Sequence, residues 1–140
     1  MTRLLAVLVV ALGLFASPAA AGLRIVHFRT PSGNIQCGYV SGGGFKPELR
    51  CEIRSGVKPL PPKPKRCEFD WGAGYFLGPT GHAEILCISD TIQVRKPPVL
   101  EYGRMWHGGA FRCLSQAIGL RCSNRAGRGF FLSRERSYSF

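Results

Sequence analysis

Acidic side chains are scarce in this 140-residue chain. Eight Asp and Glu residues stand against 19 Lys and Arg residues, which gives a formal net charge of +11. This balance favours anionic partners, such as nucleic acid, anionic envelope polymers, anionic lipid head groups or an acidic protein, and charge alone does not choose among them. The alternative interpretation is that the excess arginine only keeps the protein soluble.

Standard catalytic and cofactor motifs are also missing. The chain has no Gly-x-Ser-x-Gly, His-Glu-x-x-His, phosphate-loop or Cys-x-x-Cys sequence. Its three histidines, His27, His82 and His107, lack the spacing of metal ligands. We therefore expect no metal and no cofactor, and we favour a binding or interaction module over an enzyme.

Long apolar runs are absent after the first residues of the chain. Arg3, the apolar run Leu4–Ala16 and the small residues Ala19–Ala21 together predict a signal peptide over 1–21, whose removal leaves a single domain over 22–140. Without Arg3, 18 basic and 8 acidic side chains leave a net charge of +10. No later run reaches the roughly 20 apolar residues that a membrane-spanning helix needs. We expect a secreted or periplasmic protein with no transmembrane segment after signal removal. The sequence favours no particular oligomeric state.

Six cysteines follow the predicted signal peptide. An even number of cysteines in an exported chain predicts disulfides, and six cysteines allow 15 pairings. We favour neighbours along the chain because each bond then closes a hairpin-sized loop. The expected pairs are Cys37 with Cys51, Cys67 with Cys87, and Cys113 with Cys122.

Apolar residues recur mostly at every second position, which is typical of strands. Leu49–Arg54 alternates apolar and charged residues without a break. A large apolar residue stands two positions before every cysteine except Cys67, so we expect five cysteines to face the core. Cys67 follows Lys65 and Arg66, which predicts a loop or a strand edge.

Further segments complete a mainly β protein. Turn-forming residues separate three more candidate strands, Arg24–Phe28, Ala83–Ser89 and Gly129–Ser133, and we expect a last strand or tail that docks Phe140 on the domain. Ala83–Ile88 is apolar on both faces apart from Glu84, which predicts a central place in a sheet or between two sheets. No segment has the period of a long amphipathic helix. We predict a small disulfide-stapled antiparallel sandwich or barrel of about seven or eight short strands.

Two basic segments are the candidate binding sites. The first, 58–66, alternates prolines with Lys58, Lys63, Lys65 and Arg66, and we expect an exposed polyproline II arm that binds an anionic or aromatic-lined partner or merely connects two hairpins. The second interleaves aromatic rings with five arginines, a combination that suits phosphates and stacked rings. These arginines are Arg121, Arg125, Arg128, Arg134 and Arg136, and the rings are Phe130, Phe131 and Tyr138.

Two weaker hypotheses remain open. His82 and Glu84 lie two positions apart, so on a strand they share a face and could act as acid and base in a small secreted hydrolase, such as a nuclease. Several aromatic residues could line a groove for sugar or peptide, although we expect the two tryptophans among them to be core anchors packed on disulfides. These residues are Trp71, Tyr75, Phe76, Tyr102 and Trp106, and we place Trp71-Gly72 and Tyr102–Gly109 in glycine-rich connections.

A set of short motifs runs in order through most of the chain. They are Phe28 with Pro31-Ser32-Gly33-Asn34-Ile35-x-Cys37, Leu49-x-Cys51-x-Ile53, Trp71-Gly72, Gly81-x-Ala83 with Cys87 and Asp90-Thr91, Tyr102-Gly103-x-x-Trp106, Cys113-x-Ser115, Gly119-Leu120-x-Cys122-x-Asn124, and Gly127-x-Gly129-Phe130 with Leu132-Ser133-Arg134. With these motifs the chain resembles a family of small secreted bacterial six-cysteine proteins catalogued as a domain of unknown function. The resemblance implies a disulfide-bearing exported domain and brings no known activity.

Overall fold

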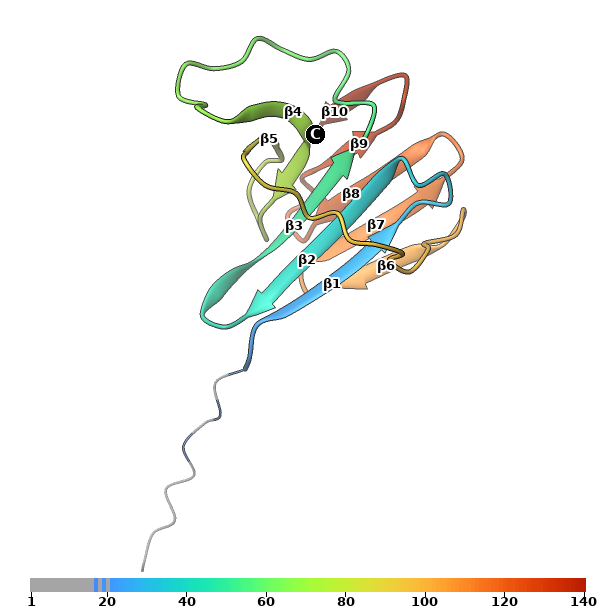
Figure 1. Ribbon diagram of the computed structural model, residues 1–140. Coiled ribbons are helices and arrows are strands. Elements are labelled where there is room, and N and C mark those ends of the chain that lie inside the picture. Colours follow the sequence, from blue (N-terminus) through green and yellow to red (C-terminus); the bar gives the residue numbers. More distant parts are fainter. Residues whose placement is uncertain (1–16, 18, 20) are drawn as a thin grey trace, which may run out of the picture.

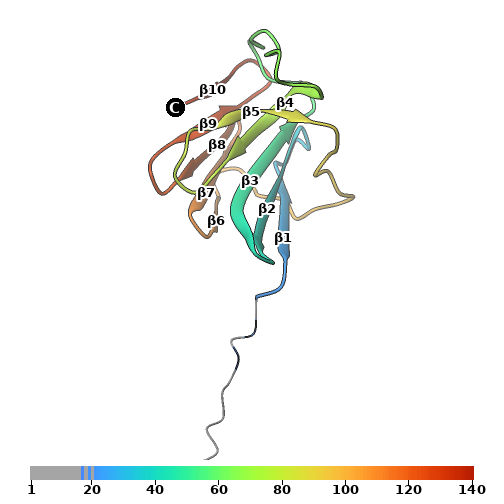
Figure 2. The ribbon, with the colours of Figure 1, turned by 90° about the vertical axis from the view of Figure 1, so that its left-hand side faces the viewer.

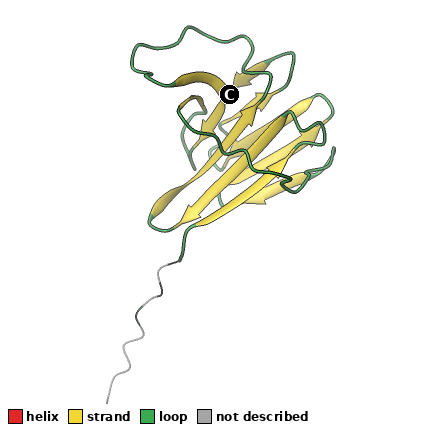
Figure 3. Ribbon diagram, viewed as in Figure 1, coloured by secondary structure: helices red, strands yellow, loops and turns green. Residues whose placement is uncertain are grey.

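The computed structural model describes residues 17, 19 and 21–140 (Figure 1). The predicted signal peptide, 1–21, lies almost entirely outside these residues. The described part holds ten strands and no helix (Figure 3). No helix in it is long and apolar enough to cross a membrane.

The ten strands form two five-stranded antiparallel sheets, each a simple meander. Sheet A contains β1 (Arg24–Arg29), β2 (Ile35–Gly42), β3 (Phe45–Ile53), β4 (Asp70–Leu77) and β5 (Glu84–Ile88), in that order. Sheet B contains β6 (Met105–Gly108), β7 (Phe111–Gln116), β8 (Gly119–Asn124), β9 (Gly129–Leu132) and β10 (Ser137–Ser139). Figure 2 shows the sheets as two layers. The mainly β sandwich is thus confirmed, with more strands than predicted.

The core lies between the two sheets, where aromatic rings from both layers meet. Tyr75 of sheet A stacks on Phe130 of sheet B, with ring centroids 5.3 Å apart. Trp106 of β6 stacks on Phe28 at 4.9 Å and meets Tyr39 edge-on at 5.5 Å. Such pairs stabilise a core by about 0.5 to 1.5 kcal/mol beyond the area that they bury.

All three predicted disulfides are present. Cys37 pairs directly with Cys51 in the β2–β3 ladder, and Cys113 with Cys122 in the β7–β8 ladder, so each bond joins two facing positions of one hairpin. These four cysteines are fully buried in the core, as predicted, whereas Cys87, the fifth cysteine predicted to face the core, is half-buried. The third bond joins Cys87 of β5 to Cys67, which lies in a loop.

The predicted central place for Ala83–Ile88 is wrong, because β5 is an edge strand of sheet A. Ile85 packs against the core, Leu86 on the opposite face is only 4% exposed, and Cys87 carries the disulfide to the loop. A strand can therefore be apolar on both faces at a sheet edge when a loop is bonded to it there.

The prediction of two glycine-rich connections is wrong at Trp71-Gly72 and right only in part at Tyr102–Gly109, where residues 102–104 and 109 lie in loops. Trp71-Gly72 belongs to β4, and Met105–Gly108 is β6. Glycine is favoured at Gly72 because its φ is +95°, a conformation that other residues rarely adopt, and at Gly108 because the Trp106 ring lies against the backbone. A glycine inside a strand often marks such a close approach, which the sequence does not distinguish from a turn.

Candidate functional site

The outer faces of the two sheets differ in what covers them. The chain passes from β5 to β6 through a segment that crosses the outer face of sheet A, which we call the strap (Asp90–Leu100; Figure 1). At its far end, the backbone amide of Leu100 donates to the carbonyl of Arg29, and the amide of Arg29 donates to the carbonyl of Pro98. The strap thus reaches from one edge of sheet A to the other.

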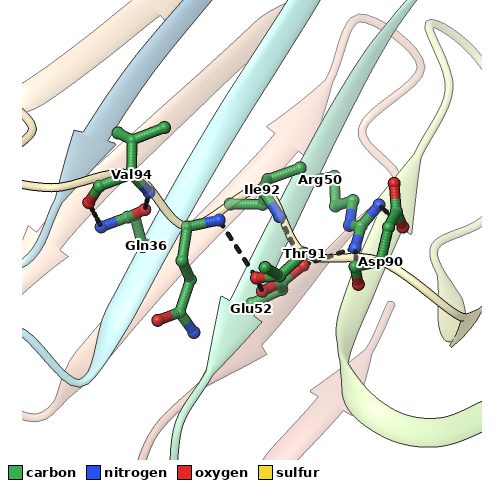
Figure 4. A network of polar contacts seen from close by, with 8 residues as sticks. Gln36, Arg50, Glu52, Asp90, Thr91, Ile92 and Val94 are labelled. Carbon is green, nitrogen blue, oxygen red and sulfur yellow. Dashed lines mark hydrogen bonds and ion pairs between the residues drawn. The ribbon is translucent and has the colours of Figure 1, made fainter.

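A polar network holds the start of the strap on β3 (Figure 4). The carboxylate of Glu52, which is 4% exposed, accepts hydrogen bonds from the Thr91 hydroxyl and from the amide of Ile92 (3.0 Å). Arg50 forms ion pairs with Glu52 and with Asp90 (2.9 Å). A buried charge is tolerated only when it is paired and hydrogen-bonded, and this one is.

The middle of the strap is held on β2 in a similar way. The carboxamide of Gln36, a residue 7% exposed, accepts from the amide of Val94 and donates to the Val94 carbonyl (3.2 Å). Ile92 of the strap lies over Gly38 of β2. The polar groups of Gln36 and Glu52 bond the strap, so we assign these two residues a structural role.

No comparable segment lies over the outer face of sheet B in the described chain. Apolar, aromatic and arginine side chains gather there. Register places five of them in one row across the sheet, because Met105 pairs with Leu114, Leu114 with Arg121, Arg121 with Phe131, and Phe131 with Tyr138. Met105 is 46% and Tyr138 39% exposed. Phe131 is only 5% exposed and stacks on Tyr138, so the row presents Met105, Arg121 and Tyr138 to solvent.

Two glycines let the aromatic rings lie on this face. A side chain at Gly119 would meet the Phe131 ring at 2.6 Å, and one at Gly129 would meet the Phe140 ring at 2.9 Å. Phe140 is fixed beside Gly129 by two backbone hydrogen bonds of 2.9 Å. The expected docking of Phe140 on the domain is confirmed, and it adds a ring to the face.

One guanidinium stacks on these rings and a second lies within cation–π distance of two of them. The Cζ atom of Arg121 lies 3.7 Å from the centre of the Phe140 ring. That of Arg136 lies 5.9 Å from the Phe131 ring and 5.7 Å from the Tyr138 ring. A guanidinium that stacks on a ring keeps its N–H donors in its own plane, directed away from the ring.

The cations of this face have no acidic partner among the described residues, where the only ion pairs are those of Arg50. Arg112 of β7 donates from Nε to the Ser123 hydroxyl (3.1 Å), which holds its side chain on the sheet. We define the arginine–aromatic face by six residues, Arg112, Arg121, Arg136, Phe131, Tyr138 and Phe140. Its arrangement suits an anion, since oriented guanidinium donors bind carboxylate, sulfate or phosphate oxygens.

The structure divides the predicted C-terminal cluster among three places. Arg121 lies within sheet B, and Arg136 lies within cation–π distance of its rings. Arg125 and Arg128 are exposed in the β8–β9 turn, at one end of the sheet, whereas Arg134 is exposed in the β9–β10 turn. Because β9 runs between these turns, Arg134 is at the opposite end of the sheet.

Sequence reasoning missed Arg112, which follows Phe111 and precedes Cys113 in an alternating strand. That alternation is a signal that Arg112 points outward. Only the strand order, with β7 beside β8, places it near Arg121.

The proline-rich segment is an exposed loop, as predicted. Lys58, Lys63, Lys65 and Arg66 are all exposed. Three contacts hold the loop: the Trp71 indole donates to the Pro61 carbonyl (3.0 Å), the Lys58 carbonyl accepts from the amide of Ser137, and the disulfide of Cys67 closes its end. Its cations form no ion pair in the described structure.

His82 and Glu84 are both exposed, but His82 lies in the loop before β5, whereas Glu84 begins β5 and pairs with Phe76. Other side chains line five cavities of the described residues. The acid–base hypothesis therefore stays a prediction that no contact supports.

The aromatic residues divide between core and surface. Trp106 packs against the core, as predicted, and so does Tyr75, which was a groove candidate. The prediction of a core anchor is wrong for Trp71, which is half-buried and holds the proline-rich loop. Tyr102 is 46% exposed and lines a small cavity. Tyr75 is the residue whose pKa is raised, because burial disfavours the charged phenolate.

No group of three His, Cys, Asp or Glu residues that could hold a metal ion occurs in the part of the chain that the structure describes. A family model described as "Family of unknown function (DUF6636)" matches residues 5–140. Comparison with curated proteins and with solved structures finds no match.

Proposed function

The chain belongs to this family of unknown function, and from its structure we propose an exported, non-enzymatic binding module that holds an anionic partner on the arginine–aromatic face of sheet B. The stacking of Arg121 on Phe140 at 3.7 Å is the observation that carries the proposal. A ring that fixes a guanidinium before binding reduces the side-chain entropy that binding must remove.

Charge and compartment support the same function. The net charge of +10 expected after signal removal attracts polyanions over a distance of about 10 Å at 0.1 M salt. Three disulfides suit an oxidising compartment, where anionic envelope polymers, nucleic acid and acidic proteins are the partner classes that charge alone allows.

Among the two basic surfaces, we favour sheet B over the proline-rich loop. The loop cations Lys63, Lys65 and Arg66 are exposed and stack on no ring in the described structure. Long unpinned side chains lose more conformational entropy when they bind, so equal charge gives weaker binding there.

Three polyanions test the proposal: heparin, long-chain polyphosphate and single-stranded DNA. Binding of each labelled polymer to residues 22–140 is measured by fluorescence anisotropy over a salt series. The triple variant Arg112→Gln, Arg121→Gln, Arg136→Gln is compared with the loop variant Lys63→Gln, Lys65→Gln, Arg66→Gln, which removes the same charge.

We expect the sheet variant to bind at least about tenfold more weakly than the loop variant. For single-stranded DNA, the slope of log K against log salt should become shallower by roughly 2, since each neutralised phosphate contributes about 0.7. Absence of binding to all three polymers, or a larger loss in the loop variant, would refute the proposal.

A further inference from the structure

One end of the sandwich contains a cavity of about 160 Å³ that residues of both sheets line. Thr30, Ser32 and Asn34 come from the turn after β1, Gln116 ends β7, and Arg134 lies in the β9–β10 turn. Tyr102, beyond the strap, completes the wall. The cavity thus depends on the two sheets being packed together.

Hydrogen bonds within the turns fix the cavity wall. Thr30 is 3% exposed, and its hydroxyl bonds both the amide and the carbonyl of Ile35. Ser133 is 5% exposed, and its hydroxyl accepts from the amides of Glu135 (3.3 Å) and Arg136 (3.1 Å). These side chains are occupied, so they shape the site and do not bind a ligand.

Other polar groups of the wall are available to a ligand. The half-buried carboxamide of Gln116, the hydroxyl of Tyr102 and the guanidinium of Arg134 make no hydrogen bond to any described residue. The Oε2 atom of Glu135 accepts a hydrogen bond from the Ser133 hydroxyl, and its Oε1 atom accepts none from the described residues. The site therefore offers both donors and acceptors within one small space.

The charge of this cavity differs from that of the rest of the molecule. Arg134 and Glu135 are its only charged residues, so the wall is formally neutral on a strongly cationic chain. A site for a polyanion would carry an excess of cations, as the arginine–aromatic face does. Neutral walls with balanced donors and acceptors favour an uncharged polar ligand.

Apolar surface stands at the rim. The Tyr102 ring is 46% exposed and Ile118 is 66% exposed. A sugar has the matching chemistry, because hydroxyls surround its edge and C–H groups cover its faces, which pack on aromatic rings. Ligand pockets for larger molecules occupy about 300 to 1,000 Å³, so this cavity suits one ring-sized unit.

We propose that the end cavity between the β1–β2, β7–β8 and β9–β10 turns binds a single sugar unit, with Gln116, Arg134 and Glu135 bonding its hydroxyls and Tyr102 packing on its face. The site adjoins the arginine–aromatic face, because Ile118, Ser133 and Glu135 also line a hollow with Phe131 and Arg136. The proposal does not rest on the function proposed for that face. A zwitterion that pairs with Arg134 and Glu135 is the main competing ligand.

Amide chemical shifts of residues 22–140 test the proposal. Free glucose, galactose, mannose and N-acetylglucosamine are titrated in turn to millimolar concentrations, alongside glycine as the zwitterion. We expect at least one sugar to shift the amides of residues 32–35, 102, 116–119 and 133–135, and glycine to leave them in place.

Two variants assign the site. Tyr102→Ala and Gln116→Ala should each weaken the sugar by about tenfold, because each removes one contact from a small ligand. Phe45→Ala is the control, since Phe45 is 66% exposed in the β2–β3 hairpin, at the opposite end of sheet A from the β1–β2 turn, and the affinity should be unchanged. No shifts with any of the four sugars, shifts located elsewhere, or a response to glycine alone would overturn the proposal.

Discussion

A single glycine, Gly129, allows the Phe140 ring to pack against the backbone of sheet B. Gly129 pairs with Ser123 in the β8–β9 ladder, and a Cβ atom there would meet the Cys122 carbonyl and the Phe140 ring. The ring in turn supports Arg121. The absence of a Cβ atom at Gly129 thus allows the Phe140 ring to lie where it supports the Arg121 guanidinium.

We predict that Gly129→Ala destabilises the protein by about 1 to 3 kcal/mol, the usual cost of overpacking. The affinity for polyanions should also fall, because the Phe140 ring is displaced. Chemical denaturation and the anisotropy assay measure the two effects. Gly81→Ala is the matched control, since nothing lies within 4 Å of its added Cβ; equal stability of the two variants would contradict the packing argument.

Tyr75 is a second residue whose environment has a measurable effect. Burial raises the pKa of its phenol above the ordinary value of about 10. Below pH 10 the phenol is protonated in both states and its contribution to stability is complete. As the pH rises further, the unfolded chain loses the proton first, so stability falls.

We predict that a late component appears in the tyrosinate absorbance titration and disappears in Tyr75→Phe. The fold should be followed by circular dichroism in the same samples, so that unfolding is separated from local titration. If the difference between the two proteins titrates near pH 10, Tyr75 is not shielded from water as the structure indicates.

At the scale of elements, the strap gives sheet A a covered face and leaves sheet B as the face open to a partner. Its hold depends on Glu52, which is buried and accepts from Thr91 and Ile92. Removing this carboxylate would leave Arg50 with Asp90 alone and the strap donors without an acceptor. The expected result is local opening of the strap.

We predict that Glu52→Ala lowers the free energy of unfolding by about 3 kcal/mol, as for a broken buried ion pair. It should also speed hydrogen exchange at the amides of Ile92 and Val94. The control is Glu48→Ala on the same strand, whose carboxylate makes no hydrogen bond in the described structure. Unchanged exchange at Ile92 would show that the network does not hold the strap.

The sequence predicts elements well where one signal suffices. Leu49–Arg54 alternates, and the neighbouring cysteines close hairpins because they face each other in register. Predictions from sequence failed where glycine stands in a strand, as in β4 and β6, and where a loop covers an edge, as at Cys87. In those places packing with distant residues overrides the local pattern.

The candidate face could be predicted only in part. Arg121 and Arg136 were identified from charge and neighbouring rings, whereas Arg112 joins them through the pairing of β7 with β8. Gln36 and Glu52, which hold the strap, look in the sequence like the solvent-facing positions of alternating strands. The local periodicity of apolar residues predicts neither the order of strands in a sheet nor the path of a proline-containing segment such as the strap.

On the scale of the whole molecule, disulfides add stability to a modest core. The bond between Cys67 and Cys87 spans 20 positions and ties the proline-rich loop to the edge of sheet A. In the chain-entropy model a loop of this length contributes about 3 kcal/mol. This is a large part of the usual margin of about 5 to 15 kcal/mol.

We therefore predict that Cys67→Ala with Cys87→Ala lowers the free energy of unfolding by about 2 to 4 kcal/mol, because the unfolded chain gains freedom. Denaturant titration measures the change. Affinity for polyanions should survive, since the loop contacts sheet B at Ser137 of β10, whereas Arg112 and Arg121 lie on β7 and β8. A lost affinity in a folded variant would mean that the loop takes part in binding.

The assignment of anion binding to sheet B can be mapped directly. Long-chain polyphosphate is titrated into labelled residues 22–140, and changes in amide and arginine side-chain resonances are located on the structure. We predict that the largest changes fall on Arg112, Arg121, Phe131, Arg136 and Tyr138. Changes centred instead on residues 58–66, with sheet B unaffected, would contradict the assignment.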